Sequence, residues 1–224
     1  HRNGVPNIPE SIPPEQLAYD HYQGVLSKNV VTLASLLRDS GYHTYMTGKW
    51  HLGHTPELLP SARGFERTIA MADTGADNWE QRTYLPIYDE AHWYADGEKH
   101  TLPDDFYSSE YFVDKTIEFI NANESDDKPF FAYIPFQAVH MPVQAPREFS
   151  DKYAGVYDEG WTVMRERRRL AAEEVGVIPE TNPLKPTRQP TKDQPDNQPE
   201  INQKPTRQPT SNQPESNQQL TRNQ

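Results

Sequence analysis

The stretch GYHTYMTGKWHLGHTPELLP, residues 41–60, decides how the chain folds. Within it, residues 42–47 alternate β-forming side chains between two faces, as a strand does. A lysine and a histidine, Lys49 and His51, follow two positions apart where this strand is expected to end. The stretch therefore raises the question of whether the strand delivers a pair of proton-carrying side chains to a binding site.

The spacing of Lys49 and His51 favours an anion site. If the backbone remains extended between them, both side chains point to the same side, and the ammonium and the imidazole converge while Trp50 faces into packing. Gly48 and Gly53 would let the backbone turn tightly and approach a ligand closely. Lysine suits an oxygen of sulfate or phosphate, and a neutral histidine beside it can transfer a proton. On pairing alone, a solvated surface turn is the commoner explanation.

A helix is expected directly before this strand. It begins at Asn29 or Thr32, either of which can cap it, and it ends at Gly41. Its apolar positions recur at helical spacing, and they are Val30, Leu33, Leu36 and Leu37. A helix that leads into a strand within a few residues is half of a βαβ unit, which indicates an α/β fold with parallel strands.

A second unit of the same kind follows. A helix is expected over residues 108–123, capped by Ser108 or Ser109, and the apolar run FFAYIPF, residues 130–136, predicts a buried parallel strand. The predicted helical stripe consists of Phe112, Val113, Thr116, Ile117 and Ile120. His140 comes just after this strand, and in open α/β sheets ligands bind at the carboxyl ends of strands. A lone loop histidine is usually structural, but this position can place His140 beside Lys49 and His51.

Composition separates a folded body from a tail. Residues 185–224 are rich in Gln, Pro, Asn, Thr and Ser and repeat KPTRQPT with a period of 19 residues. Such a segment cannot bury enough apolar surface to order itself, so it is expected to be disordered. The chain is therefore divided into a folded body, residues 1–184, and a low-complexity tail, residues 185–224. One more helix is expected within the body, from about Trp161 to Val175.

Charge and motif content exclude several classes of protein. The formal net charge is −11, and because the tail carries six bases and four acids, that of residues 1–184 is −13. A surface this acidic repels nucleic acids and anionic membranes. The chain has no cysteine and no HxH or HExxH pattern, so neither thiol chemistry nor a zinc site is predicted. The GxSxG elbow and the Walker A loop are also absent.

The motif GYHTYMTGKWHLG strongly resembles the second signature of the sulfatase family. SARGFE resembles the family's Arg-Gly-Phe-Asp segment, and KPFFAYIPFQAVHMPVQAP resembles the middle of bacterial-type arylsulfatases, with Ala-Val-His in place of the usual Ala-Pro-His. The resemblance extends over roughly residues 1–183. It implies an alkaline-phosphatase-like α/β sandwich with a mostly parallel central sheet, of which this chain would hold a part.

The resemblance also implies a chemistry and roles for residues. Sulfatases hydrolyse sulfate monoesters with a formylglycine nucleophile, made from Cys or Ser in a Cys/Ser-x-Pro-x-Arg motif beside a divalent cation, usually calcium. Lys49 resembles the lysine that contacts the sulfate. His51 resembles the histidine that hydrogen-bonds the formylglycine and assists sulfate release, and His140 the one that contacts the ester oxygen and protonates the leaving alcohol. Cations and donors placed at the developing charges would stabilise that transition state.

The chain departs from the family pattern where the chemistry begins. It contains no Cys/Ser-x-Pro-x-Arg motif, and the family's metal ligands are expected outside it. We therefore expect a fragment of an arylsulfatase-type sulfuric ester hydrolase that shows no turnover by itself. The complete enzyme would cleave a small-molecule or carbohydrate sulfate ester, would hold a divalent cation such as calcium, and would depend on the formylglycine-generating enzyme.

Two other functions remain open. The chain could belong to a phosphonate or phosphate monoester hydrolase of the same superfamily, although the Trp-His-Leu-Gly continuation favours a sulfatase. It could instead be a non-catalytic remnant that acts as an interaction module. A periplasmic, secreted or lysosomal compartment is expected from the family alone.

Overall fold

The computed structural model describes Val5 and residues 8–179. Its contacts divide the chain into two compact units, residues 1–144 and residues 145–224. The expected tail lies outside the described residues, so the division at residue 184 stays a prediction. Within the described part, no helix is both long enough and apolar enough to cross a membrane.

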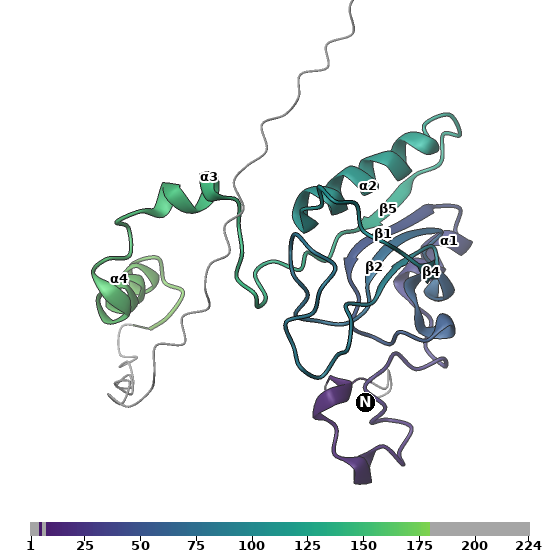
Figure 1. The fold of residues 1–224 in the computed structure, drawn as a ribbon, viewed down its shortest axis with the longest axis horizontal. Coiled ribbons are helices and arrows are strands. Elements are labelled where there is room, and N and C mark those ends of the chain that lie inside the picture. Colours follow the sequence, from purple (N-terminus) through teal and green to yellow (C-terminus); the bar gives the residue numbers. More distant parts are fainter. Residues whose placement is uncertain (1–4, 6–7, 180–224) are drawn as a thin grey trace, which may run out of the picture. The chain divides into compact units, whose positions relative to one another are not determined.

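The first unit is built around one five-stranded sheet with the order β4-β3-β2-β1-β5 (Figure 1). Its strands are β1 (His43–Lys49), β2 (Arg67–Met71), β3 (Trp93–Ala95), β4 (Glu98–Lys99) and β5 (Phe130–Tyr133). Its helices are α1 (Leu33–Asp39) and α2 (Ser108–Ala122), with short 3-10 turns η1 (Pro9–Ser11), η2 (Pro14–Gln16), η3 (Pro56–Leu58) and η4 (Pro60–Arg63). The second unit contains α3 (Arg147–Ser150), η5 (Asp151–Tyr153) and α4 (Gly160–Glu174).

The sheet is mixed, with a parallel centre. β1 pairs in parallel with β2 on one side and with β5 on the other. β3 and β4 extend the sheet in the antiparallel sense from β2. The predicted α/β class with parallel central strands is therefore confirmed. The three parallel strands bring their carboxyl ends to one edge of the sheet, where ligands bind in such folds.

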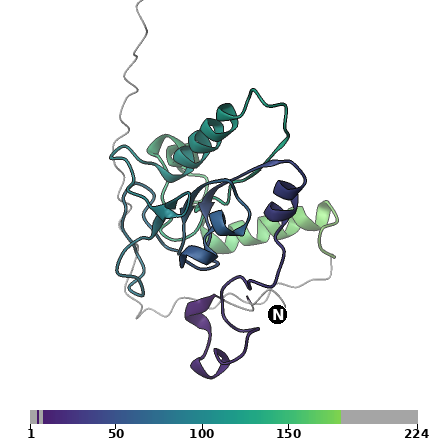
Figure 2. The same cartoon turned by 90° about the vertical axis from the view of Figure 1, so that its right-hand side faces the viewer.

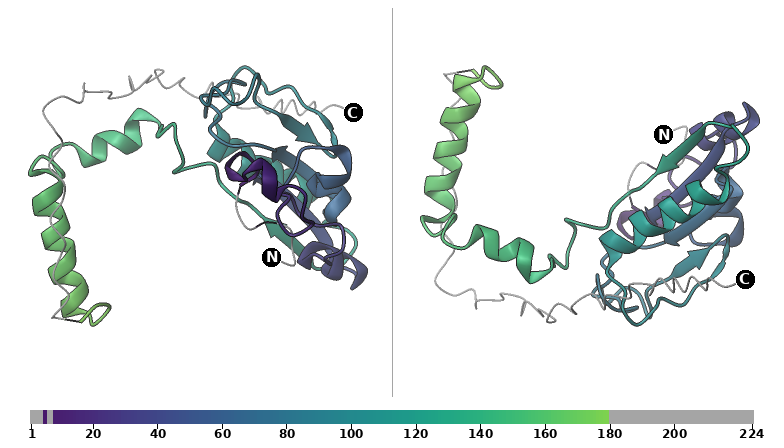
Figure 3. Two further views of the ribbon diagram at one scale, coloured as in Figure 1. Left: turned by 90° about the horizontal axis from the view of Figure 1, so that it is seen from below. Right: turned by 90° about the horizontal axis from the view of Figure 1, so that it is seen from above.

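Side chains of β1 pack alternately toward two layers of helix. Tyr45 belongs to a core cluster with Phe112 and Phe119 of α2, which runs along one face of the sheet (Figure 3). Met46 belongs to a second cluster with Ala34 of α1. Both faces of β1 are thus buried, which is why residues 44–47 of the strand are apolar or threonine.

The burial of the two helices matches the predicted stripes only in part. α1 is capped as expected, because the Thr32 hydroxyl accepts a hydrogen bond from Ser35 N at 3.0 Å. However, Ala34 is the one buried residue of α1, whereas Leu33 and Leu36 of the predicted stripe are 60% and 56% exposed. In α2, Phe112 and Thr116 of the predicted stripe are buried, together with Ser108 and Phe119, while Val113 and Ile117 remain exposed. The predicted stripe is therefore wrong for α1 and partly correct for α2.

The strand β5 is shorter and more exposed than predicted. It covers four residues of the predicted run, and it lies at an edge of the sheet with one paired side. Phe130 and Tyr133 are 51% and 45% exposed. No residue of the predicted run, 130–136, is buried, so the prediction of a buried strand is wrong, although the strand is parallel as predicted. In the second unit, α4 forms where a helix was expected, and none of its residues is buried.

Gly48 allows β1 and the chain beyond β5 to approach closely. Its φ is +146°, and a Cβ at this position would lie 2.2 Å from the backbone oxygen of Pro135. Lys49 N donates to the same oxygen at 2.8 Å. Only glycine meets both conditions, because any side chain would collide with backbone that cannot move aside.

We expect Gly48→Ala to destabilise the protein strongly. Backbone strain costs about 1–3 kcal/mol and forced repacking adds a similar amount, so a loss of about 3 kcal/mol is predicted. Gly41→Ala is the matched control, because Gly41 also has a positive φ, +92°, but a Cβ there would have nothing within 4 Å. Urea unfolding of the three proteins measures the difference, and equal losses for both variants would contradict the collision with Pro135.

The opposite end of the sheet is held by an imidazole between two carboxylates. His43 Nδ1 lies 2.9 Å from Glu66 Oε2, and His43 Nε2 lies 2.6 Å from Asp126 Oδ2. Because a carboxylate accepts, both ring nitrogens donate, which requires the charged imidazolium. The hydrogen bond that His43 donates to Asp126, and then the one to Glu66, accordingly raise the pKa of His43. This contact joins the beginnings of β1, β2 and β5.

The raised pKa of His43 makes stability depend on pH. A raised folded-state pKa stabilises fully below the unfolded value of about 6.5, and this stabilisation is lost as pH rises through the folded value. We therefore expect the urea midpoint to fall as the pH rises from about 6.5 through the raised pKa of folded His43, and His43→Gln to flatten that fall. His21→Gln, in an exposed turn, should keep the wild-type slope. An unchanged slope in His43→Gln would refute the assignment.

Candidate functional site

The segment after β1 is fixed between the exits of its two neighbours. On the β2 side, Trp50 N donates to Met71 O at 2.8 Å and His51 N donates to Ala72 O at 2.9 Å. On the β5 side, Lys49 N is bonded to Pro135 O. Residues 49–51 therefore lie at the carboxyl edge of the three parallel strands, as the sequence predicted for Lys49 and His51.

Lys49 presents a partly buried cation without a counter-ion. Its side chain is half-buried, and burial lowers the pKa of Lys49, an effect that the charge of Glu10 opposes. Among the described residues, four other lysines form ion pairs, whereas Lys49 has no carboxylate within ion-pairing distance. A cation that has lost part of its hydration and has no partner attracts an anion.

His51 lies within electrostatic reach of Lys49. Burial and then the positive charge of Lys49 lower the pKa of His51, and the Glu10 and Asp73 carboxylates oppose this effect. The backbone route differs from the one assumed, because His51 has a φ of +52° and the extended path ends before it. The two side chains nevertheless act on each other, so the arrangement favours a neutral imidazole next to an ammonium.

Trp50 faces away from this edge, as expected. Its indole Nε1 donates to Leu58 O at 2.9 Å, and its ring packs edge-on against Phe65. The neighbouring glycines serve the same packing, since a Cβ on Gly53 would lie 2.7 Å from the Leu58 side chain and Gly48 accommodates Pro135. Packing against Pro135 and Leu58 is therefore enough to explain why these two positions are glycine, and the predicted approach of a ligand is not required.

His140 reaches the same edge from the loop after β5. Its Nε2 lies 3.3 Å from the Thr74 hydroxyl, and its Nδ1 lies 2.8 Å from Met141 O. Since a carbonyl only accepts, Nδ1 carries the proton and Nε2 accepts from Thr74. Thr74 belongs to the short segment after β2 that also binds His51 N through Ala72. Within the described part of the chain no hydrogen bond joins His140 to Lys49 or His51, and their catalytic roles stay predictions.

Several polar residues at this edge were not found from the sequence. Glu10 comes from η1, in the purple N-terminal segment that appears at the bottom of both views (Figures 1 and 2), and its Oε2 lies 3.4 Å from His51 Nε2. Tyr88, from the loop between β2 and β3, donates to the other oxygen of Glu10. Neither residue lies in a periodic segment or near a strand end in the sequence, so no pattern pointed to them.

A buried aspartate follows β2 and joins two histidines. His54 Nδ1 lies 3.3 Å from Asp73 Oδ1, and His92 Nδ1 is hydrogen-bonded to Asp73 Oδ2. The two imidazole rings stack with their centroids 5.5 Å apart. The signal that could have located Asp73 is its position just beyond an apolar run, residues 68–71, which is the same logic that located Lys49.

This arrangement does not fit a resident metal ion. Across residues 8–179, no group of three or more His, Asp or Glu side chains is placed to hold one. The Asp73 oxygens are instead occupied by imidazole nitrogens, which leaves that cluster satisfied by its own hydrogen bonds. What the described residues can do is bind an anion and exchange protons.

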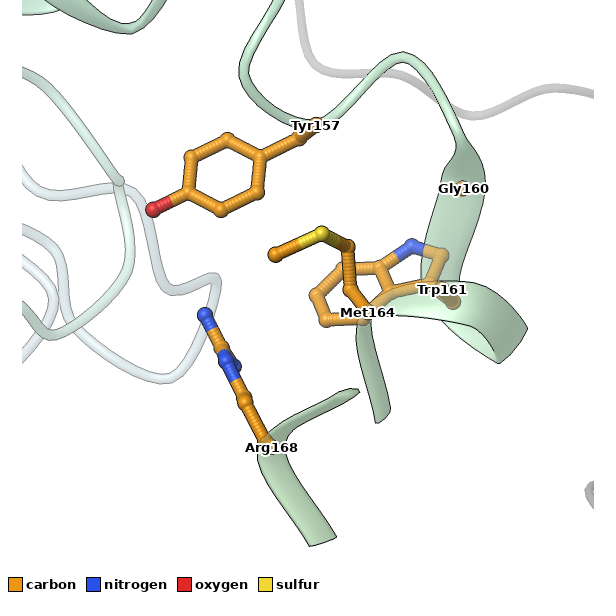
Figure 4. Close-up of a pocket in the computed structure, with 5 residues that line it drawn as sticks. All are labelled: Tyr157, Gly160, Trp161, Met164 and Arg168. Atoms are coloured by element: carbon orange, nitrogen blue, oxygen red, sulfur yellow. The ribbon is translucent and has the colours of Figure 1, made fainter. Parts of the chain in front are cut away.

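A separate hollow lies in the second unit and involves none of these residues. Tyr157, Trp161, Met164 and Arg168 surround a cavity of about 320 Å³ at the start of α4 (Figure 4). Its lining comes from one helix and the turn before it, and Trp161 is 86% exposed. No hydrogen-bonding group in this hollow is buried, so it has no feature that selects a ligand.

Comparison with known proteins decides the family. The sequence model of the sulfatase family matches residues 3–217. The chain belongs to the sulfatase family. An uncharacterized sulfatase of Schizosaccharomyces pombe is 40% identical over 169 residues, which cover 71% of this chain and 30% of the relative. An arylsulfatase of Klebsiella aerogenes is 36% identical over 165 residues, which cover 73% of this chain and 35% of the relative.

This sulfatase chain spans about a third of the length of the curated relatives it matches. Among solved structures, Ps i-CgsB matches with a TM-score of 0.52 at 22% identity, over 60% of this chain and 32% of that protein. Its complex with k-i-k-neocarrahexaose matches with a TM-score of 0.50 at 22% identity, over 58% of this chain and 31% of that protein. These likenesses support the fold, and the alkaline-phosphatase-like architecture expected from the sequence is confirmed.

The coupling of Lys49 to His51 can be tested directly. Because the lysine charge disfavours the imidazolium, Lys49→Met should raise the pKa of His51. Titration of the His51 ring by NMR measures this value. Lys28→Met removes an exposed lysine that pairs with Glu57 instead, and it should leave the His51 titration unchanged. A His51 pKa that does not rise in Lys49→Met would show that the two side chains are not coupled.

Proposed function

We propose that this chain contributes the sulfate-binding part of a sulfuric ester hydrolase of arylsulfatase type. The observation that carries the proposal is the half-buried Lys49 ammonium without an ion pair among the described residues, next to His51 at the carboxyl edge of the sheet. A sulfate monoester offers such a cation three oxygens that share one negative charge, and a charge-assisted hydrogen bond is stronger than a neutral one. Membership of the sulfatase family makes sulfate the first ligand to consider.

Each side chain has a proposed task. Lys49 neutralises charge on the sulfate oxygens, and His51, kept neutral by burial and by Lys49, accepts or donates a proton beside the reacting group. His140, which Thr74 contacts at this edge, is proposed to protonate the leaving oxygen of the ester. Arylsulfatase specificity and a small-molecule or carbohydrate sulfate as substrate belong to the same proposal.

The complete enzyme requires groups beyond the described residues. Sulfatases generally use a divalent metal ion, calcium in most of them, and a formylglycine. We propose that both are held elsewhere in the complete protein, with the formylglycine-generating enzyme as the partner that makes the nucleophile. On the family alone, an exported or lysosomal compartment is proposed.

Ligand binding tests this proposal without requiring turnover. The full chain is titrated with phenyl sulfate and followed by NMR at the His51 ring. Removal of one charge-assisted contact in Lys49→Met should weaken binding about tenfold. Lys28→Met controls for the loss of a surface charge, and the spectrum of each variant shows whether the fold is kept. If Lys49→Met binds phenyl sulfate as tightly as the unchanged protein, the proposed sulfate site is wrong.

A further inference from the structure

An acidic side chain lies beside the proposed sulfate site. Glu10 is carried there by the short turn η1, and its Oε2 lies 3.4 Å from His51 Nε2. It is also the charged group whose field acts on Lys49, where it opposes the effect of burial on the lysine pKa. A carboxylate therefore lies at the margin of the proposed anion site. Because a carboxylate repels anions, its presence is unexpected if the site serves only to attract them.

The carboxylate is fixed by a phenol. Tyr88 donates its hydroxyl hydrogen to Glu10 Oε1, and this bond joins two segments that are 78 residues apart in the sequence. Burial and then the bond to Glu10 raise the pKa of Tyr88 far above its ordinary value, so the phenol keeps its proton. The phenol can therefore donate to Glu10 at neutral pH.

Glu10 itself remains charged. Burial would raise the pKa of Glu10, but the bond from Tyr88, a backbone hydrogen bond and the nearby His51 together hold it below its ordinary value. The site consequently contains a partly buried ammonium and a charged carboxylate that both act on one imidazole. An anion that binds Lys49 gains from the lysine and is repelled by Glu10.

The repulsion grows with the charge of the ligand. A sulfate monoester carries one negative charge, whereas a phosphate monoester carries two above its second pKa of about 6. Each negative charge of the ligand is repelled by Glu10, so the repulsion energy of the doubly charged ester is about twice that of the singly charged one. For one additional charge at a distance of about 6 Å and an effective dielectric constant of about 60, the penalty corresponds to roughly a fivefold change in affinity.

We propose that Glu10, anchored by Tyr88, determines specificity at the Lys49–His51 site by favouring singly charged sulfate monoesters over doubly charged phosphate monoesters. The proposal rests on the proposed function, because it assumes that an ester binds at Lys49. It assigns to Glu10 a role in selection by charge, in addition to its contact with His51.

The test compares phenyl sulfate with phenyl phosphate, which share the same aryl group. Both dissociation constants are measured by NMR titration of the full chain at about pH 8, where the phosphate is doubly charged. In Glu10→Gln, the preference for phenyl sulfate over phenyl phosphate should fall roughly fivefold. Glu15→Gln is the matched control, since Glu15 occupies the corresponding place in the next Pro-Glu-x turn, η2, and is exposed. It should keep the wild-type preference.

A second measurement separates charge selection from a merely structural role. At about pH 5 phenyl phosphate is mostly singly charged, so Glu10→Gln should no longer change the preference. Both esters then carry one charge, so a change in the charge of Lys49 or His51 would affect them alike at this pH. Tyr88→Phe frees the carboxylate without removing its charge, and it should produce a smaller change in the same direction as Glu10→Gln at about pH 8.

The outcomes distinguish this proposal from the one it rests on. If phenyl sulfate binds in a Lys49-dependent way but Glu10→Gln leaves the preference unchanged at about pH 8, charge selection by Glu10 is wrong and the sulfate site stands. A preference that shifts equally at both pH values would assign Glu10 a structural role and also overturn the proposal. If neither ester shows binding that depends on Lys49, both proposals fail.

Discussion

The pairing of β1 on both of its edges is the constraint on which the site depends. Because β2 and β5 hold the strand from either side, its exit has one possible direction, and the backbone of residues 49–51 continues the same hydrogen bonding past the end of the strand. Gly48 makes this possible by letting the chain after β5 pass within contact distance of β1. The contacts that pack the sheet therefore also fix the position of Lys49.

Electrostatics at this edge work against the charge of the molecule as a whole. The chain carries a formal net charge of −11, and a surface of that sign repels anions over distances of about a Debye length. Partial burial of Lys49 separates it from that average field and strengthens its interaction with a nearby ligand. Glu10 and Asp73 then adjust the site locally through His51. Affinity for anions therefore depends on a few side chains near His51. Because these side chains carry charges of both signs, they can distinguish one anion from another.

The elements of the sheet could be predicted from the sequence only where local pattern and burial agree. β1 was predicted because it is buried on both faces and has strong β-formers throughout. β2 was not predicted, since its run of residues 68–71 is short and follows Glu66 and Arg67. The β3–β4 hairpin was also overlooked, although its turn, Asp96-Gly97, is the two-residue type that favours a hairpin and both residues have positive φ.

The buried faces of the helices, and contacts between residues far apart in the sequence, could be identified only from the tertiary structure. Periodicity located α1 and α2 and correctly placed Phe112 inward, but it also placed Leu33 and Val113 inward, and both are exposed while Ala34 is buried. Which side of a helix is buried depends on the surface opposite, and the sequence of the helix does not contain that surface. The same reason hid Glu10 from sequence analysis, because it meets His51 across 41 residues of chain. Lys49 could be predicted from its position at the end of a strand, whereas the residues around it, such as Glu10, were identified only from the fold.

The backbone hydrogen bonds of residues 49–51 carry a consequence for how such a protein can change. The groups that anchor this segment are main-chain N–H groups, which every residue except proline possesses. The side chain at position 49 can therefore be exchanged while the scaffold keeps its shape, whereas the φ of +52° at position 51 favours His, Asn, Asp or Gly there. An evolving or engineered lineage could thereby replace one ligand preference by another at this strand end without having to invent a new architecture.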